Sequence, residues 1–264
     1  MAEIKLVDTI SSYGRAEQQI KLNTQFVRFL RNKYGVSEIK SISAMEVGKK
    51  YNLAGVTFGN YLTQEERYFM LFKVAKQLEL LSKIKGSNDL GKGMLVVSLG
   101  AQGHGGRSNA HYSPSGNVIN LARGRKTDYD DFMKGENSFV HEYGHFLDFY
   151  QGHFKDKSLS YNWASENENM KWSNKNTLLI SSVTQTIVDD EKYMEGLGQS
   201  MYLRSRIEIW ARIFEASVTA IVREKYPEYD RFFDRKYNEH IYYPVAQIRK
   251  KKIDQKIAKT IKSI

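Results

Sequence analysis

Two histidines lie four residues apart in the stretch FVHEYGHFLDFY, and an acid directly follows the first of them. On a helix, His141 and His145 would leave the same face one turn apart, so both imidazoles could reach one zinc ion. Glu142 would lie about 100° around the helix from His141, where it could accept a proton from a metal-bound water. The pattern H-E-x-x-H therefore indicates two zinc ligands and a general base.

The alternative is a pair of buried or surface histidines that bind no metal. Gly144 favours the zinc site, since its small size lets the backbone pack closely against the metal or a neighbouring element. The other neighbours are apolar, which places the histidines at the edge of a core: Phe139, Val140, Phe146, Leu147 and Tyr150.

A catalytic zinc site usually has three protein ligands and one open position. The chain has no cysteine, so the third ligand must be a histidine or an acid. His153 fits poorly, because it follows an expected helix stop at Gly152 and does not match the longer zincin spacing. Asp148, three residues after His145, better suits a supporting role that steadies a ligand or a neighbouring loop.

A downstream helix must therefore supply the missing ligand. The segment RSRIEIWARIFEASVTAIVREKY has a broad apolar face at helical spacing and carries Glu208 and Glu215, seven residues apart on one face. Both are candidates on pattern alone, and either could instead face solvent or form a salt bridge. Arg212 follows Glu208 by four residues, and a pair between them would argue against metal ligation.

Apolar periodicity indicates the elements that position these residues. Residues up to about Val47 look mostly helical, and Thr63 with Glu66 has the capping-box spacing at the start of a helix that runs to about Lys85.

Two short apolar runs, 94–100 and 117–122, are typical of buried strands. The site helix is expected over 136–151, and the polar stretch 155–198 is interpreted as an insertion with helical pieces. Because helices and strands do not alternate as βαβ units, the sequence predicts an α+β fold.

The chain has 264 residues and a formal net charge of +10. The last sixteen residues, RKKKIDQKIAKTIKSI, hold seven basic residues and one acid, a net charge of +6. Such a tail can make weak contact with nucleic acid or attract an acidic partner. The alternative is a solvated terminal helix that docks through a narrow stripe of Ile253, Ile257 and Ile261. The N-terminus has no apolar run of signal-peptide length, and no stretch approaches a membrane span, so no membrane partner is expected.

Four segments in order, LAGVTFGNYLTQEER, AHYSPSGNVINLARG, SFVHEYGHFLDFY and EIWARIFEASV, resemble the large polyvalent protein-associated domain 1. This is a zincin-like metallopeptidase domain of bacteriophage and plasmid proteins, and the resemblance covers residues 53–222. HEYGHFLDFYQG with EIWARIF is also similar to the catalytic domain of anthrax lethal factor. The resemblance implies a small mixed sheet, an active-site helix and a downstream helix that carries a glutamate. It divides the chain into an N-terminal helical segment (1–50), the zincin-like domain (51–225) and a basic helical tail (226–264).

The resemblance also assigns roles to the candidate residues. It makes His141, His145 and Glu208 the zinc ligands and Glu142 the base, and it leaves Glu215 as a supporting acid.

Three further assignments follow from the same resemblance. Tyr202 falls, with an offset of one residue, near the position of a tyrosine that stabilises the oxyanion. Such folds present an edge strand to which a peptide substrate adds, and the candidate here is NVINLA, with Asn117 and Ile119 as binding residues. His111 would line the cleft, or else be a turn histidine that bonds backbone.

The expected function is that of a zinc-dependent metallopeptidase of phage or mobile-element origin, which hydrolyses a protein or peptide with a zinc-bound water activated by Glu142. It would act in the cytoplasm of a bacterial host or be packaged in a virion. Two alternatives are a phage structural or injected protein with a relict site, and a nucleic-acid-associated protein with a structural zinc and a binding tail at 249–264.

Overall fold

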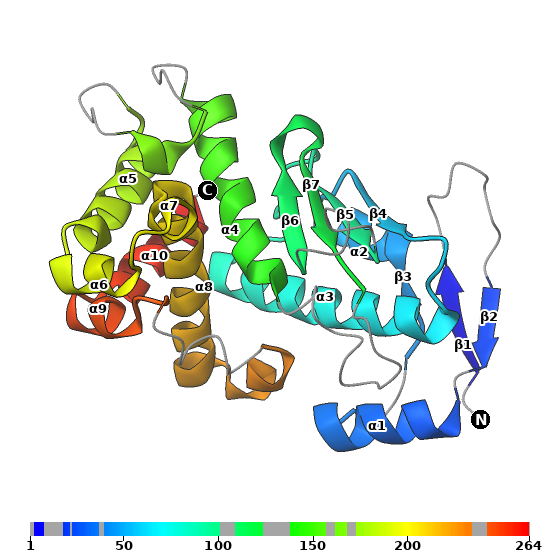
Figure 1. The fold of residues 1–264 in the computed structure, drawn as a ribbon. Coiled ribbons are helices and arrows are strands. Elements are labelled where there is room, and N and C mark those ends of the chain that lie inside the picture. Colours follow the sequence, from blue (N-terminus) through cyan, green and yellow to red (C-terminus); the bar gives the residue numbers. More distant parts are fainter. Residues whose placement is uncertain are drawn as a thin grey trace. The chain divides into compact units, whose positions relative to one another are not determined.

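The computed structural model describes residues 3–7, 18–21, 23–36, 40–100, 109–123, 138–156, 162–167, 173–233 and 242–263. The described part is a mixed α+β structure, as the sequence predicts (Figure 1). The chain forms two compact units, Met1–Phe139 and Val140–Ile264. The boundary falls inside the segment 51–225, which was expected to be a single domain.

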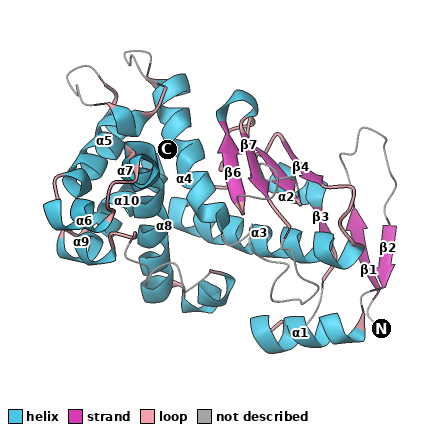
Figure 2. Cartoon of the chain, viewed as in Figure 1, coloured by secondary structure: helices cyan, strands magenta, loops and turns pink. Residues whose placement is uncertain are grey.

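The first unit contains all the described strands (Figure 2). Its elements are β1 (Glu3–Val7), β2 (Gln18–Lys21), α1 (Thr24–Tyr34), β3 (Ile42–Ser43), α2 (Ala44–Lys50), β4 (Gly55–Phe58), α3 (Gln64–Lys85), β5 (Val96–Leu99), β6 (Ala110–Ser113) and β7 (Val118–Leu121). β1 pairs antiparallel with β2 and parallel with β3. The expectation of a mostly helical N-terminal segment holds for α1 and α2 but misses these three strands. These strands are stabilised by pairing between separate segments of the chain, and a prediction from one local stretch cannot detect such pairing.

The capping box expected at the start of α3 is confirmed. Thr63 Oγ1 accepts from the backbone N–H of Glu66, and a Glu66 carboxylate oxygen accepts from the Thr63 N–H at 2.8 Å. The helix ends at Gly86, whose φ of 76° is the left-handed conformation that glycine adopts without strain.

The four-stranded sheet of this unit has the order β4-β5-β7-β6. β4, β5 and β7 are parallel, and β6 is antiparallel to β7. β7 is thus paired on both sides, and the expectation that NVINLA offers a free edge is wrong. The Ile119 side chain is also completely buried, so neither its backbone nor its side chain is free to bind a peptide in the expected way.

The other two residues expected to bind substrate have partners within the same sheet. Asn117 lies in the turn before β7, with a φ of 49°, and its side-chain oxygen accepts from the Tyr112 hydroxyl at 2.8 Å. His111 lies on β6, which forms a described edge of the sheet, and its Nε2 is 3.0 Å from Nδ2 of Asn120. His111 therefore bonds a cross-strand side chain.

The second unit is helical throughout its described part. Its elements are α4 (Phe139–Phe149), a π-helix (Tyr150–Lys155), a 3-10 helix (Ala164–Glu166), α5 (Lys175–Val188), α6 (Glu191–Gly196), α7 (Met201–Arg204), α8 (Arg206–Lys225), a 3-10 helix (Pro227–Phe232), α9 (Val245–Lys250) and α10 (Ile253–Ser263). In the described residues, no helix is both long enough and apolar enough to cross a bilayer.

The buried helix α8 is the centre of this unit, and α5, α9 and α10 pack against it. α5 belongs to the core, because Ile180, Val183 and Ile187 are completely or almost completely buried. The stretch 155–198 thus contains the expected helical pieces, and one of them packs in the core of the unit. The docking stripe expected on the tail is confirmed, since the isoleucines of α10 that face α5 and α8 are at most 2% exposed.

The site helix has its expected core but not its expected end. Its predicted start at residue 136 lies outside the described residues. At the other end, the helix continues past Gly152 as a π-helix to Lys155. A Cβ at Gly152 would lie 2.6 Å from the backbone of Asn162 and Ala164, so glycine is required there for close approach of two chain segments.

Candidate metal centre

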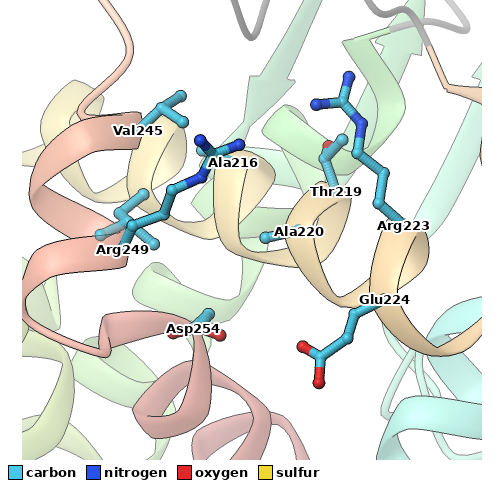
Figure 3. A pocket seen from close by; sticks show the side chains of 9 residues that line it. Ala216, Thr219, Ala220, Arg223, Glu224, Val245, Arg249 and Asp254 are labelled. Atoms are coloured by element: carbon cyan, nitrogen blue, oxygen red, sulfur yellow. The ribbon is translucent and has the colours of Figure 1, made fainter.

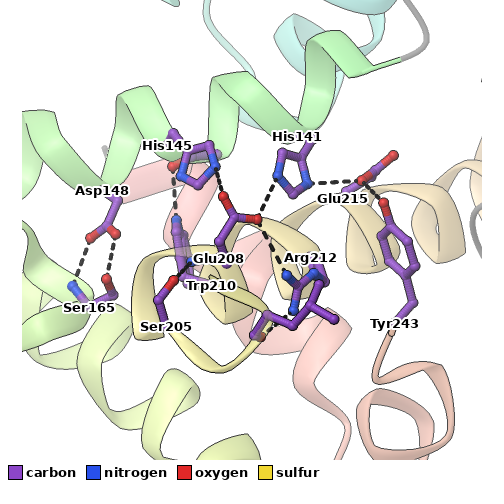
Figure 4. A network of polar contacts seen from close by, with 12 residues as sticks. His141, His145, Asp148, Ser165, Ser205, Glu208, Trp210, Arg212, Glu215 and Tyr243 are labelled. Atoms are coloured by element: carbon purple, nitrogen blue, oxygen red, sulfur yellow. Dashed lines mark hydrogen bonds and ion pairs between the residues drawn. The ribbon is translucent and has the colours of Figure 1, made fainter. Parts of the chain in front are cut away.

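Helices α4 and α8 bring two imidazoles and one carboxylate together (Figure 4). Nε2 of His141 lies 3.4 Å from one carboxylate oxygen of Glu208, and Nε2 of His145 lies 3.4 Å from the other. Each residue offers a ligand atom, and these three atoms lie within 4.8 Å of one another. The sequence left Glu208 and Glu215 as equal candidates, and of these two the structure places Glu208 between the histidines.

The separations suit a shared cation better than direct hydrogen bonds. A good N–H···O bond spans about 2.7–3.2 Å, and 3.4 Å is longer than this. Donors about 2.1 Å from a tetrahedral zinc ion lie about 3.4 Å from one another. The His141, His145 and Glu208 side chains can therefore hold a metal ion.

The crossing of α4 and α8 fixes this geometry. A Cβ at Gly144 would lie 3.2 Å from Phe214 of α8, so the small residue allows the two helices to approach closely. Trp210 Nε1 donates to the Gly144 carbonyl at 2.9 Å. The Ser205 hydroxyl caps α8 by accepting from the Glu208 N–H, which places Glu208 in the first helical turn.

The other ring nitrogen of His141 is also held. His141 Nδ1 lies 3.2 Å from Oε2 of Glu215, and the Tyr243 hydroxyl donates to the same oxygen at 2.8 Å. A carboxylate on the outer nitrogen fixes the tautomer and orientation of a ligating imidazole. Glu215 thus has the geometry of the supporting acid, and Tyr243 is a participant that the sequence did not reveal.

Arg212 pairs with Glu208, which the sequence analysis named as a possible argument against metal ligation. Its Nη2 lies 3.4 Å from a Glu208 oxygen, and its Nη1 donates to the Leu203 carbonyl at 2.7 Å. A carboxylate has about four acceptor positions, so this long contact leaves Glu208 able to face both histidines. The buried guanidinium therefore orients Glu208 without removing it from the site.

The charges of the group are strongly coupled when no ion is bound. Burial lowers the pKa of His141, but the Glu208 and Glu215 carboxylates outweigh this and raise that pKa to about 10. Burial alone would raise the pKa of Glu208, yet the two histidines hold it well below its ordinary value. A metal that binds here must therefore displace a proton from His141.

Similarity to known proteins adds no independent assignment. No protein-family model matches the chain, and no curated protein or solved structure is significantly similar to it. What the site can do follows from its own donor atoms and from the residues around them.

Asp148 supports a neighbouring turn and contacts no candidate ligand in the described structure. It is completely buried and accepts from the backbone N–H of Ser165 at 2.7 Å and from the Ser165 hydroxyl at 2.5 Å. The same turn carries Trp163, whose ring meets His145 edge to face with centroids 6.2 Å apart. Asp148 therefore steadies the segment that packs on a candidate ligand, one of its two expected roles.

The Asp148→Asn variant should change the pH dependence of stability. Burial raises the pKa of Asp148 to about 7, although the two bonds from Ser165 oppose the shift. With a raised folded-state pKa, the stability that Asp148 contributes is fully present below about pH 4 and is lost as the pH rises through about 7. The asparagine side chain can keep both contacts to Ser165 and cannot ionise. Urea unfolding between pH 5 and pH 8 should show the variant gaining up to a few kcal/mol relative to the wild type, whereas a constant difference would contradict the buried, titrating acid.

Tyr202, on α7, has an exposed ring and a hydroxyl influenced by the site. The residue is 64% exposed. Partial burial of the hydroxyl and the negative charges of Glu208 and Glu142 raise the pKa of Tyr202, which keeps it a neutral hydrogen-bond donor.

Glu142 is buried and directly follows His141 on α4. His153 is exposed and is held instead by Asn162, at 3.0 Å.

Proposed function

We propose that this protein is a zinc-dependent metallopeptidase with a zincin-like site. The observation that carries the proposal is the 3.4 Å separation of both imidazole nitrogens from the two oxygens of Glu208. Two histidines and one glutamate are the usual protein ligands of one class of catalytic zinc site, and such a set leaves the fourth position open.

The residues around the site support hydrolysis. Bound zinc would act as a Lewis acid and lower the pKa of a coordinated water from 15.7 to about 7. Glu142 would accept a proton from the attacking water and return it to the leaving amine. Tyr202 would donate a hydrogen bond to the oxyanion that develops on the substrate carbonyl. Arg212 and Glu215 would hold Glu208 and His141 in place.

Tyr243→Phe should weaken zinc binding without unfolding the protein. The change removes only the hydroxyl that holds Glu215 against His141, so we expect the metal affinity to fall by up to about tenfold. Chelator competition followed by a zinc indicator measures this directly. Tyr226→Phe is the matched control, because its hydroxyl lies outside the network around Glu215. Equal affinity in wild type and Tyr243→Phe would show that the phenol does not support the ligand.

The proposed activity is tested by metal analysis together with a peptide-library digest. We expect one zinc per chain, and hydrolysis of a subset of peptides that stops on treatment with 1,10-phenanthroline and returns with added zinc. Mass spectrometry of the products identifies the scissile bonds. A zinc-loaded protein that cleaves no member of a diverse library would overturn the peptidase assignment while leaving the metal site intact.

A further inference from the structure

The two C-terminal helices and the turn between them carry six exposed cations, which we call the basic face. It consists of the side chains of Arg249, Lys250, Lys252, Lys256, Lys259 and Lys262. Within the described part of the chain, none of these side chains forms an ion pair or a hydrogen bond. The adjacent Lys251 is different, since its Nζ donates to the Thr186 carbonyl at 2.8 Å. The basic face therefore carries charge that the described fold does not neutralise.

The opposite side of α10 is already occupied. Ile253 and Ile257 are completely buried, Ile261 is 2% exposed, and the helix packs on α8 and α5. A basic amphipathic helix binds a membrane by inserting its apolar side among the lipids. Because the fold buries that side, α10 has only its charges to offer a partner.

The spacing of the lysines suits a regular row of negative charges. Lys256, Lys259 and Lys262 recur every three residues, so they share one broad side and rise about 9 Å along the helix axis. One strand of B-form DNA carries a phosphate about every 3.4 Å along its axis, which gives two to three phosphates over that length.

The same surface lacks the features of a protein-binding site. Stable protein interfaces contain a desolvated apolar core, and their cores are depleted of charged residues. The large apolar side chains exposed in the described structure are Met45, Tyr61, Phe154, Met201 and Tyr202, and none belongs to α9 or α10. A charged polymer fits this surface better than an acidic protein does.

A cavity of about 350 Å³ lies between α9 and α8, and two arginines and two acids line it. The guanidinium groups of Arg223 and Arg249 lie on one side of it, and the carboxylates of Glu224 and Asp254 lie on the other (Figure 3). Arg249 thus belongs to both the cavity and the basic face. Arg223 Nε lies 3.7 Å from a carboxylate oxygen of Asp230, so of these two arginines only Arg249 adds to the unpaired positive charge.

We propose that the basic face binds the phosphate backbone of nucleic acid without reading base sequence. The contact uses lysines that point to solvent, and it does not depend on the proposed peptidase activity. Affinity should therefore fall steeply with salt and vary little with sequence.

Fluorescence anisotropy with a labelled 20-base-pair duplex of arbitrary sequence, at 50–200 mM KCl, tests this. A variant of the 264-residue chain that combines four changes should bind at least about tenfold more weakly at 50 mM KCl. The four changes are Lys252→Gln, Lys256→Gln, Lys259→Gln and Lys262→Gln. They should also reduce the slope of log K against log salt by about 0.9 for each lysine that contacts a phosphate.

The matched control removes four exposed cations elsewhere, by Arg28→Gln, Arg31→Gln, Lys49→Gln and Lys192→Gln. Both variants change the net charge equally, so the proposal requires that only the first one loses binding. Circular dichroism shows whether each variant is folded. Equal loss in both variants would mean that only the overall charge matters, and no loss in the first would remove the basic face from the interaction. Displacement of DNA by polyglutamate at matched charge concentration would also overturn the proposal, because the face would then accept any acidic polymer.

Discussion

Glu142→Gln should retain zinc and reduce peptide hydrolysis by about 10²–10⁴-fold, the range that general base catalysis contributes. Glutamine has nearly the same shape as glutamate but cannot accept the proton of the attacking water. Glu142 is not one of the three residues whose ligand atoms converge, so its amide should leave the metal affinity nearly unchanged. Zinc content by elemental analysis and kcat with a fluorogenic peptide from the library digest separate the two effects.

Glu224→Gln is a suitable control, because Glu224 is an exposed acid further along α8 that lines the cavity beside α9. It should keep both zinc and activity. Full activity in Glu142→Gln would eliminate the proposed mechanism. Loss of zinc in that variant would instead mean that Glu142 holds the ion.

Glu208→Ala should abolish zinc binding at micromolar metal, whereas Glu215→Ala should weaken it by about 10–100-fold. The first change removes the carboxylate that faces both histidines, and the second removes only the group behind His141. Competition with chelators of graded affinity measures the zinc affinity of each variant. It therefore distinguishes the loss of a metal ligand from the loss of a group that only positions one.

Glu208→Ala also leaves the buried Arg212 without its carboxylate, which could destabilise the fold. Glu208→Gln keeps a polar partner for Arg212 at nearly the same volume and should still lose most of the affinity. Zinc retained by a folded Glu208→Gln variant, or lost only with Glu215→Ala, would show that the ligand assignment is wrong.

The sequence predicted the local parts of the site and left the distant ones open. H-E-x-x-H places two donor side chains one turn apart on a single helix, so the local sequence of α4 is enough to bring them together. Glu208 and Glu215 share a face of α8, so periodicity could not separate them. The two glutamates lie about 10 Å apart along the helix axis, and this separation gives them different neighbours. Glu208, in the first turn, faces Nε2 of both histidines, whereas Glu215 contacts only Nδ1 of His141.

Properties that depend on pairing between distant segments could not be predicted. The central position of β7 depends on β5 and β6 together, and NVINLA has the same pattern whether it lies inside a sheet or at its edge. Gly152 looked like a helix end because glycine is common there, but its role is to admit the segment around Trp163. Tyr243 follows Glu215 by 28 residues, and no spacing rule connects them.

The docked C-terminal helices define the smallest fragment worth expressing. A truncated protein limited to residues 53–222, the span of the sequence resemblance, would lack Tyr243 and the isoleucines of α10. The sides of α5 and α8 that α10 covers would then be exposed to solvent, which favours aggregation. A fragment that keeps the candidate metal centre must therefore extend to the end of α10, and tags or fusion partners should be joined in a way that leaves this helix in place.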